Sequence, residues 1–134
     1  METKINLQTI RRLYQEVWNQ KKLHVIDEIF ADDFTIHAAD VAIKEKEVLK
    51  KFIKSWLDAF PDIHHEIGDC VAVGNKLALR FQGKGTHQGQ FLDIAPTHKL
   101  FSYTGMNFVY FESAKIKTLY LNSDMYELIH QLTQ

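Results

Sequence analysis

The chain has 134 residues, of which 46% are apolar and 25% are charged, and this composition is ordinary for a globular protein with its own core. Sixteen basic and seventeen acidic residues leave a formal net charge of −1, so the charge does not favour binding to nucleic acid or to an anionic membrane. With one cysteine (Cys70), no apolar run of membrane-spanning length and no signal-peptide core, the chain is expected to form one cytoplasmic domain over residues 1–134.

The first 30 residues predict two helices. Asn6 is suited to cap the first one, because its side chain can accept a hydrogen bond from a free backbone N–H group. Apolar residues then recur at the i, i+3 and i+4 spacing of one helical face, namely Leu7, Ile10, Leu13, Tyr14 and Val17. A second, shorter helix is expected over residues 23–30, and residues 31–33 would form the turn that follows it.

Residues 34–60 predict a short strand and then a longer helix. Residues 34–37 are rich in aromatic and β-branched side chains, which favour a strand. Residues 44–60 carry lysines on one face and apolar residues four positions apart on the other, namely Val48, Phe52, Trp56 and Phe60. Pro61 ends this helix, because proline cannot continue a helix and restricts the residue before it.

After Pro61 the pattern changes to the alternation of strands. Residues 63–73 and 76–81 predict two antiparallel strands joined by a turn at Gly74-Asn75. Residues 83–99 lead to a strand over 101–111, a turn over 112–114 and a last strand over 115–121. Ser123-Asp124 would cap a terminal helix that runs through residue 132. Helices followed by a meander of strands predict an α+β fold, in which helices packed on a strongly curved antiparallel sheet would enclose a pocket.

Several segments stand in an order that resembles one known family. They are HVIDEIFADDF at residues 24–34, FPDI at 60–63, GTHQGQFLDIAPT at 85–97, and Lys115-Ile116 ahead of Asp124 and the tail at 128–132. Together they resemble the SnoaL-like polyketide cyclases of the nuclear-transport-factor-2-like (NTF2-like) superfamily. The resemblance implies an α+β cone with a deep pocket and a homodimer formed through the outer face of the sheet. It also implies, for relatives that are enzymes, ring closure by aldol condensation without metal or organic cofactor.

Two positions depart from the family pattern. His37 is kept, but Ala38-Ala39-Asp40 replaces the Asp/Asn-Pro turn and glycine that relatives tend to have. On the last strand, Tyr120-Leu121-Asn122 stands where relatives commonly carry Trp and an acid, which leaves Asp124 as the nearest acid. In the more distant ketosteroid isomerases, the base would fall at His37-Ala38 and the oxyanion-hole acid at Asn107. Steroid isomerase activity is therefore not expected.

Proton abstraction requires a base, hydrogen-bond donors for the developing enolate, and an apolar pocket that excludes water. We assign Asp124 as the candidate base, His87 as a proton donor or shuttle, and Asn107 as the amide that would orient a carbonyl. Each has a structural alternative, which is a helix cap for Asp124, a loop hydrogen bond for His87 and a backbone hydrogen bond for Asn107. The residues predicted to line the pocket and contact a ligand are His37, Trp56, Tyr103, Tyr120 and Asn122.

His64 and His65 do not predict a metal site. Adjacent residues of a strand point to opposite faces, so the two imidazoles cannot chelate one ion. No nucleotide or cofactor fingerprint is present, and no cofactor is expected. Two functions stay open at this point. One is a cofactor-free enzyme for an apolar carbonyl compound, and the other is a non-catalytic protein that binds a small hydrophobic ligand or serves as a dimeric interaction module.

Overall fold

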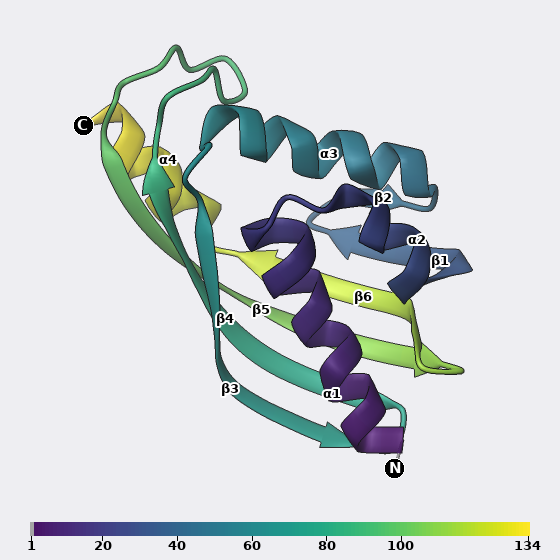
Figure 1. The fold of residues 1–134 in the computed structure, drawn as a ribbon. Coiled ribbons are helices and arrows are strands. Elements are labelled where there is room, and N and C mark those ends of the chain that lie inside the picture. The colour runs from purple at the N-terminus through teal and green to yellow at the C-terminus, as the bar shows by residue number, and fades with distance from the viewer. Residues whose placement is uncertain (1) are drawn as a thin grey trace.

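The computed structural model describes residues 2–134, which form helices packed on a six-stranded sheet (Figure 1). The helices are α1 (Glu2–Arg12), the π-helix η1 (Leu13–Asn19), the 3-10 turn η2 (Leu23–Val25), α2 (Ile26–Ile29), α3 (Lys46–Ala59) and α4 (Met125–Thr133). The strands are β1 (Phe30–Ala38), β2 (Val41–Ile43), β3 (His64–Val73), β4 (Lys76–Thr86), β5 (Leu100–Glu112) and β6 (Lys115–Ser123). No helix among these residues is long and apolar enough to cross a membrane.

The sheet is mixed, with the strand order β2-β1-β6-β5-β4-β3. The run from β3 to β6 is an antiparallel meander, as expected, but β1 pairs with β6 in parallel. The prediction of an α+β fold is confirmed, and the prediction of a wholly antiparallel sheet is wrong. Tight turns force antiparallel pairing of β3 with β4 and of β5 with β6, whereas longer connections, which allow either direction, join β4 to β5 and separate β1 from β6.

Long-range contacts override the local patterns at two places near the N-terminus. Residues 31–33 belong to β1 rather than to a turn, since β1 pairs with β6 through Phe30 and again from Thr35, with an irregularity between them. Asn6 lies inside α1 and does not cap it. Its buried side chain donates from Nδ2 to the carbonyl of Gly74, at 3.2 Å, and so ties α1 to the β3–β4 turn.

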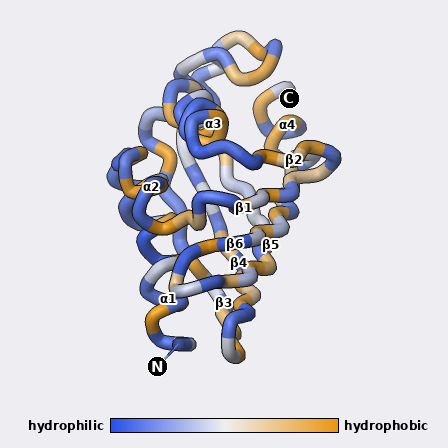
Figure 2. The backbone as a smooth tube through the Cα atoms, turned by 90° about the vertical axis from the view of Figure 1, so that its right-hand side faces the viewer, coloured by the Kyte–Doolittle hydropathy of each residue, from blue (hydrophilic) through white to orange (hydrophobic). Residues whose placement is uncertain are grey.

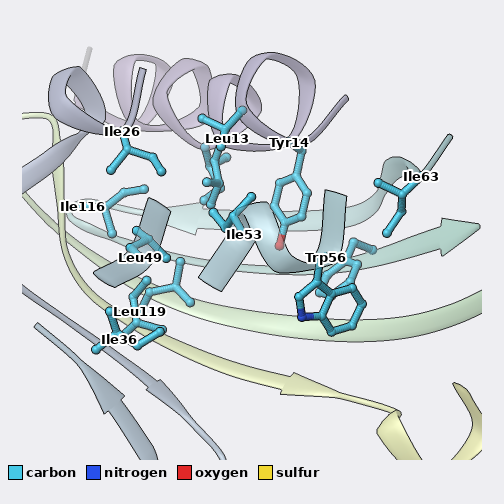
Figure 3. Close-up of a cluster of buried hydrophobic side chains, with 14 of the residues drawn as sticks. Leu13, Tyr14, Ile26, Ile36, Leu49, Ile53, Trp56, Ile63, Ile116 and Leu119 are labelled. Atoms are coloured by element: carbon cyan, nitrogen blue, oxygen red, sulfur yellow. The ribbon is translucent and has the colours of Figure 1, made fainter. Parts of the chain in front are cut away.

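Helices α1, α2 and α3 lie on the same side of the sheet (Figures 1 and 2). The strand alternation therefore has a covered face and an outer face. On β5, every second residue from Phe101 to Phe111 is buried and the residues between them are largely exposed. Figure 3 shows side chains from the helices and from the covered face meeting in one core, with Tyr14 pointing from its helix toward the sheet beside Trp56 and Ile53.

Candidate functional site

A cavity of about 60 Å³ lies between η1, α3 and the covered face of the sheet. Its walls are mainly aliphatic and aromatic, with Leu13, Trp18, Ile53, Trp56 and Phe81 among them. Pockets that enclose small ligands usually have volumes of about 300 Å³ or more. The cavity is smaller than this, so a ligand of that size would have to displace side chains of the wall.

Strand alternation and the helical stripe together bring the polar groups of the site to this cavity. Tyr103 and Asn107 occupy alternate positions on β5, and His65 shares the covered face of β3. Tyr14 approaches from η1 on the opposite wall. Gly83 leaves room for the rings between β3 and β5, because a Cβ atom there would lie 2.4 Å from the Tyr103 ring.

His65 and Tyr103 form one hydrogen-bonded pair in the cavity wall. Nε2 of His65 lies 2.5 Å from the Tyr103 hydroxyl, and both side chains are buried. Burial disfavours the charged imidazole and lowers the pKa of His65 to about 3. It also raises the pKa of the Tyr103 hydroxyl. At neutral pH the pair is therefore uncharged, and Nδ1 of His65 has no hydrogen-bond partner within residues 2–134.

Tyr14 and Asn107 form a second polar pair, which joins the η1 side of the cavity to β5. The hydroxyl of Tyr14 donates a hydrogen bond to Oδ1 of Asn107, and Nδ2 of Asn107 donates to the carbonyl of Met106 at 3.3 Å. Burial raises the pKa of Tyr14 well above that of a tyrosine in water, so the group stays a neutral donor. A phenol and an amide side by side in an apolar wall are suited to bind a carbonyl oxygen.

Three of the eight residues predicted for the site line this cavity, namely Asn107, Trp56 and Tyr103. Three others, His37, Tyr120 and Asn122, lie on the outer face of the sheet. The His37 ring stacks on the Tyr120 ring with centroids 4.7 Å apart, because these residues are paired on β1 and β6. Ile36 and Ala38, on either side of His37, line the cavity, so alternation directs His37 away from it.

Asp124, the predicted base, lies outside the cavity. It is exposed and precedes α4, where its Oδ1 accepts a hydrogen bond from the backbone N–H of Glu127 at 3.1 Å. That contact is the helix cap considered from the sequence as the alternative to catalysis. Its neighbour Ser123 lines the cavity instead. Among the described residues that line the cavity, none carries a carboxylate.

His87, the predicted proton shuttle, is fully buried in the loop after β4 and is not part of the cavity wall. Its Nδ1 accepts a hydrogen bond from the backbone N–H of Thr97 at 3.2 Å, and burial lowers the pKa of the ring. This contact joins the two ends of the loop. Phe91, from the same loop, packs edge-to-face against Trp56 with ring centroids 5.0 Å apart. His87 thus holds a loop that backs one cavity wall.

The sequence analysis missed His65 and Tyr14 as site residues. Each had a signal in the pattern, because His65 shares a strand face with the apolar Ile63 and Tyr14 belongs to the apolar stripe of the first helix. His65 was considered only as half of a metal-binding pair. Within residues 2–134, no group of three His, Cys, Asp or Glu side chains is arranged to hold a metal ion.

Comparisons with known proteins extend over nearly the whole chain. The family model for SnoaL-like polyketide cyclases matches residues 8–132. No curated protein matches. A candidate SnoaL-like polyketide cyclase from Jannaschia sp. CCS1 has 16% identity and a TM-score of 0.91, over 98% of this chain and 94% of that one. IdmH, a candidate polyketide cyclase from Streptomyces antibioticus, has 25% identity and a TM-score of 0.84, over 96% and 99% of the two chains. AclR, a candidate hydroxylase from Streptomyces galilaeus, has 23% identity and a TM-score of 0.87, over 97% and 82%.

Proposed function

The chain belongs to the SnoaL-like polyketide cyclase family, and from this premise we propose that it is a cofactor-free enzyme acting on a small apolar carbonyl compound by general acid–base catalysis. The observation that carries the proposal is the presence of two neutral polar pairs, His65–Tyr103 and Tyr14–Asn107, in an otherwise mainly apolar cavity wall. A site of this kind can both bind a carbonyl group and exchange a proton with the carbon beside it.

In this proposal the imidazole of His65 is the base. It takes a proton from the carbon next to the carbonyl, and the electron pair of the broken C–H bond passes into an enolate. The Tyr14 hydroxyl, which donates to Oδ1 of Asn107 in the structure, would turn its one O–H to the enolate oxygen. In a ring closure, the enolate carbon would then attack a second carbonyl of the same molecule, and the protonated imidazole would return its proton to the new alkoxide oxygen.

The low pKa of His65 makes it a weak base in the empty cavity. When the enolate forms, its negative charge raises the pKa of His65, because an opposite charge within about 4–6 Å favours the protonated imidazole. In this role Nε2–H of His65 donates to the Tyr103 hydroxyl oxygen and holds the ring in place, which leaves the lone pair of Nδ1 free to take the proton. The cost of charging a buried histidine is thus offset only when a substrate that can form an anion is bound.

A second function, binding without catalysis, is favoured by one specific observation. The cavity wall has no carboxylate among the described residues, and its imidazole is hard to protonate. A protein with this wall could bind the same class of carbonyl compound through Tyr14 and Asn107 and leave it unchanged. The two functions differ in one measurable event, which is the loss of a proton from the carbon beside the carbonyl.

Phenylacetone in deuterium oxide is a suitable probe, because it is compact, mainly apolar and enolisable. We expect the wild-type protein to accelerate exchange of the protons beside the carbonyl, followed by NMR, and we expect His65→Gln to slow the protein-dependent rate about 100-fold. Asp124→Ala is the matched test of the base predicted from the sequence, and it should leave the rate unchanged. Binding without accelerated exchange would favour the second function, and a rate that falls only in Asp124→Ala would refute the role of His65.

We also propose that the protein is a homodimer formed through the outer face of the sheet. Apolar side chains are exposed on that face, among them Val71, Met106, Phe108 and Tyr120. They lie on neighbouring strands and form a nearly continuous apolar surface. Contiguous apolar surface of this kind marks interaction sites more often than isolated exposed residues do.

A further inference from the structure

The free edge of β3 is hydrogen-bonded to a side chain at one residue, His65. β3 is the last strand in the sheet order, so only β4 pairs with it and its other side has no neighbouring strand. At His65, however, the side-chain amide of Asn19 takes that place. The backbone N–H of His65 donates to Oδ1 of Asn19 at 2.7 Å, and Nδ2 of Asn19 donates to the His65 carbonyl at 2.9 Å.

This contact reproduces the pairing of one residue in an antiparallel ladder. In such a ladder, a residue exchanges both its N–H and its C=O with one partner on the same side. The primary amide of Asn19 supplies the same donor and acceptor in one planar group. The arrangement also determines which way the amide points, because the opposite orientation would place a donor against a donor and an acceptor against an acceptor.

The same segment of chain holds the His65 ring. Asn19 is the last residue of η1, and its neighbour Trp18 packs on the imidazole with ring centroids 4.7 Å apart. Tyr14, also in η1, lies 5.8 Å from the same ring. One helical segment therefore holds the backbone of His65 through Asn19 and its ring through two aromatic side chains.

We propose that Asn19 is a positioning residue, which holds the backbone of His65 so that its imidazole stays in hydrogen-bond contact with Tyr103. The role of His65 as a base rests on the proposed function. The contact between Asn19 and the His65 backbone, and its effect on the position of the imidazole, do not depend on that function. Because β3 has no other neighbour on that side, loss of the amide leaves the His65 N–H and C=O to solvent and allows the strand edge to move. Small displacements of a supporting residue have large effects on a site that depends on short distances.

The test compares Asn19→Ala with Asn6→Ala. Asn6 is a matched control, because it also projects from the N-terminal helix, and it makes a single bond to backbone at Gly74, away from His65. In ¹⁵N-labelled protein, we expect Asn19→Ala to abolish the low-field proton resonance of the His65–Tyr103 hydrogen bond and to raise the pKa of the His65 imidazole by about one unit. Asn6→Ala should leave both signals as they are in the wild type. Circular dichroism would show that each variant is folded.

The phenylacetone exchange rate separates this inference from the proposed function. A fall of about tenfold in Asn19→Ala, with changed His65 signals, supports both. Changed His65 signals with an unaltered rate support the positioning role and count against His65 as the base. Unchanged His65 signals overturn the inference. If Asn19→Ala does not fold, Asn19→Leu serves in its place, because it has a similar size, carries no charge and lacks both groups that pair with the His65 backbone, so the same shifts are expected.

Discussion

At the scale of single residues, the protonation of His65 makes the stability of the folded protein depend on pH. The folded protein holds this imidazole neutral, with a pKa of about 3 against an ordinary value of 6.5. Below pH 6.5 the unfolded chain therefore binds a proton that folded His65 does not bind. The stabilisation that depends on a neutral His65 is fully present above this pH and is lost as the pH falls toward 3.

This difference predicts a loss of about 2 kcal/mol of unfolding free energy from His65 between pH 7 and pH 5. Urea denaturation at the two pH values would measure it. Because carboxylates such as Asp62 also titrate in acid, the measured quantity is the difference between wild type and His65→Gln. The glutamine variant should have the shallower pH dependence. His130→Gln, at an exposed position on α4, is the control and should follow the wild type.

At the scale of elements, the β5–β6 turn has a backbone conformation that its own residues do not favour. Ser113 and Ala114 both have positive φ, at 51° and 64°, although neither residue is glycine. Two-residue hairpin turns with positive φ at both positions strongly prefer Asn-Gly, because a Cβ atom is strained there. The β3–β4 turn has positive φ at only one of its two positions, and the residue there is a glycine, Gly74 at φ 58°. The two turns thus form a natural pair for comparison.

Ala114→Gly should raise the unfolding free energy by about 0.5–1 kcal/mol, because it removes the strain of a side chain at positive φ. The hydrogen bond from Thr9 to the Ala114 carbonyl uses only backbone at this position and is retained. Gly74→Ala is the reverse change. It should lower stability by a similar amount, since a Cβ there meets nothing within 4 Å and only the backbone strain is added. Urea midpoints of the two variants would move in opposite directions, and movement in the same direction would contradict this account.

The end of the N-terminal helical segment has a conformation that the local apolar pattern does not predict. The stripe of apolar residues predicts a regular helix, yet residues 13–19 form a π-helix, with the N–H of Gln20 bonded to the Gln15 carbonyl at 3.1 Å. Single π-turns are often found at functional sites. Here the π-turn accompanies the placement of Tyr14 and Trp18 on the cavity wall and of Asn19 on β3.

At the scale of the whole molecule, the proposed dimer has a direct test. Phe108 lies on the outer face of β5 and is 43% exposed, so Phe108→Glu would place a charge in the middle of the proposed interface. Light scattering coupled to gel filtration should give twice the monomer mass for the wild type and the monomer mass for the variant. Tyr126→Glu, on α4, changes another exposed aromatic residue, which does not belong to the sheet, and should remain dimeric. A wild-type monomer would refute the proposal.

Residue order alone is sufficient for the features that depend on neighbours along the chain. Local periodicity was sufficient to predict a helix over residues 44–60, which the structure has at 46–59, and the antiparallel meander of β3–β6. The ordered segments shared with the family were sufficient to predict the α+β fold, and the match over residues 8–132 confirms the family. These features rest on side-chain spacing within single elements, which is readable from residue order.

Packing between distant segments determines which face of each strand is covered and which residues meet across it. Periodicity placed His37 and His65 on definite faces of β1 and β3, but the packing of η1 and α3 on the sheet brought His65 into the cavity and left His37 against Tyr120. The parallel pairing of β1 with β6 and the closure of β3 by Asn19 join residues far apart in the chain. Such contacts form because they satisfy backbone groups and bury apolar surface between distant segments, and no local pattern records them.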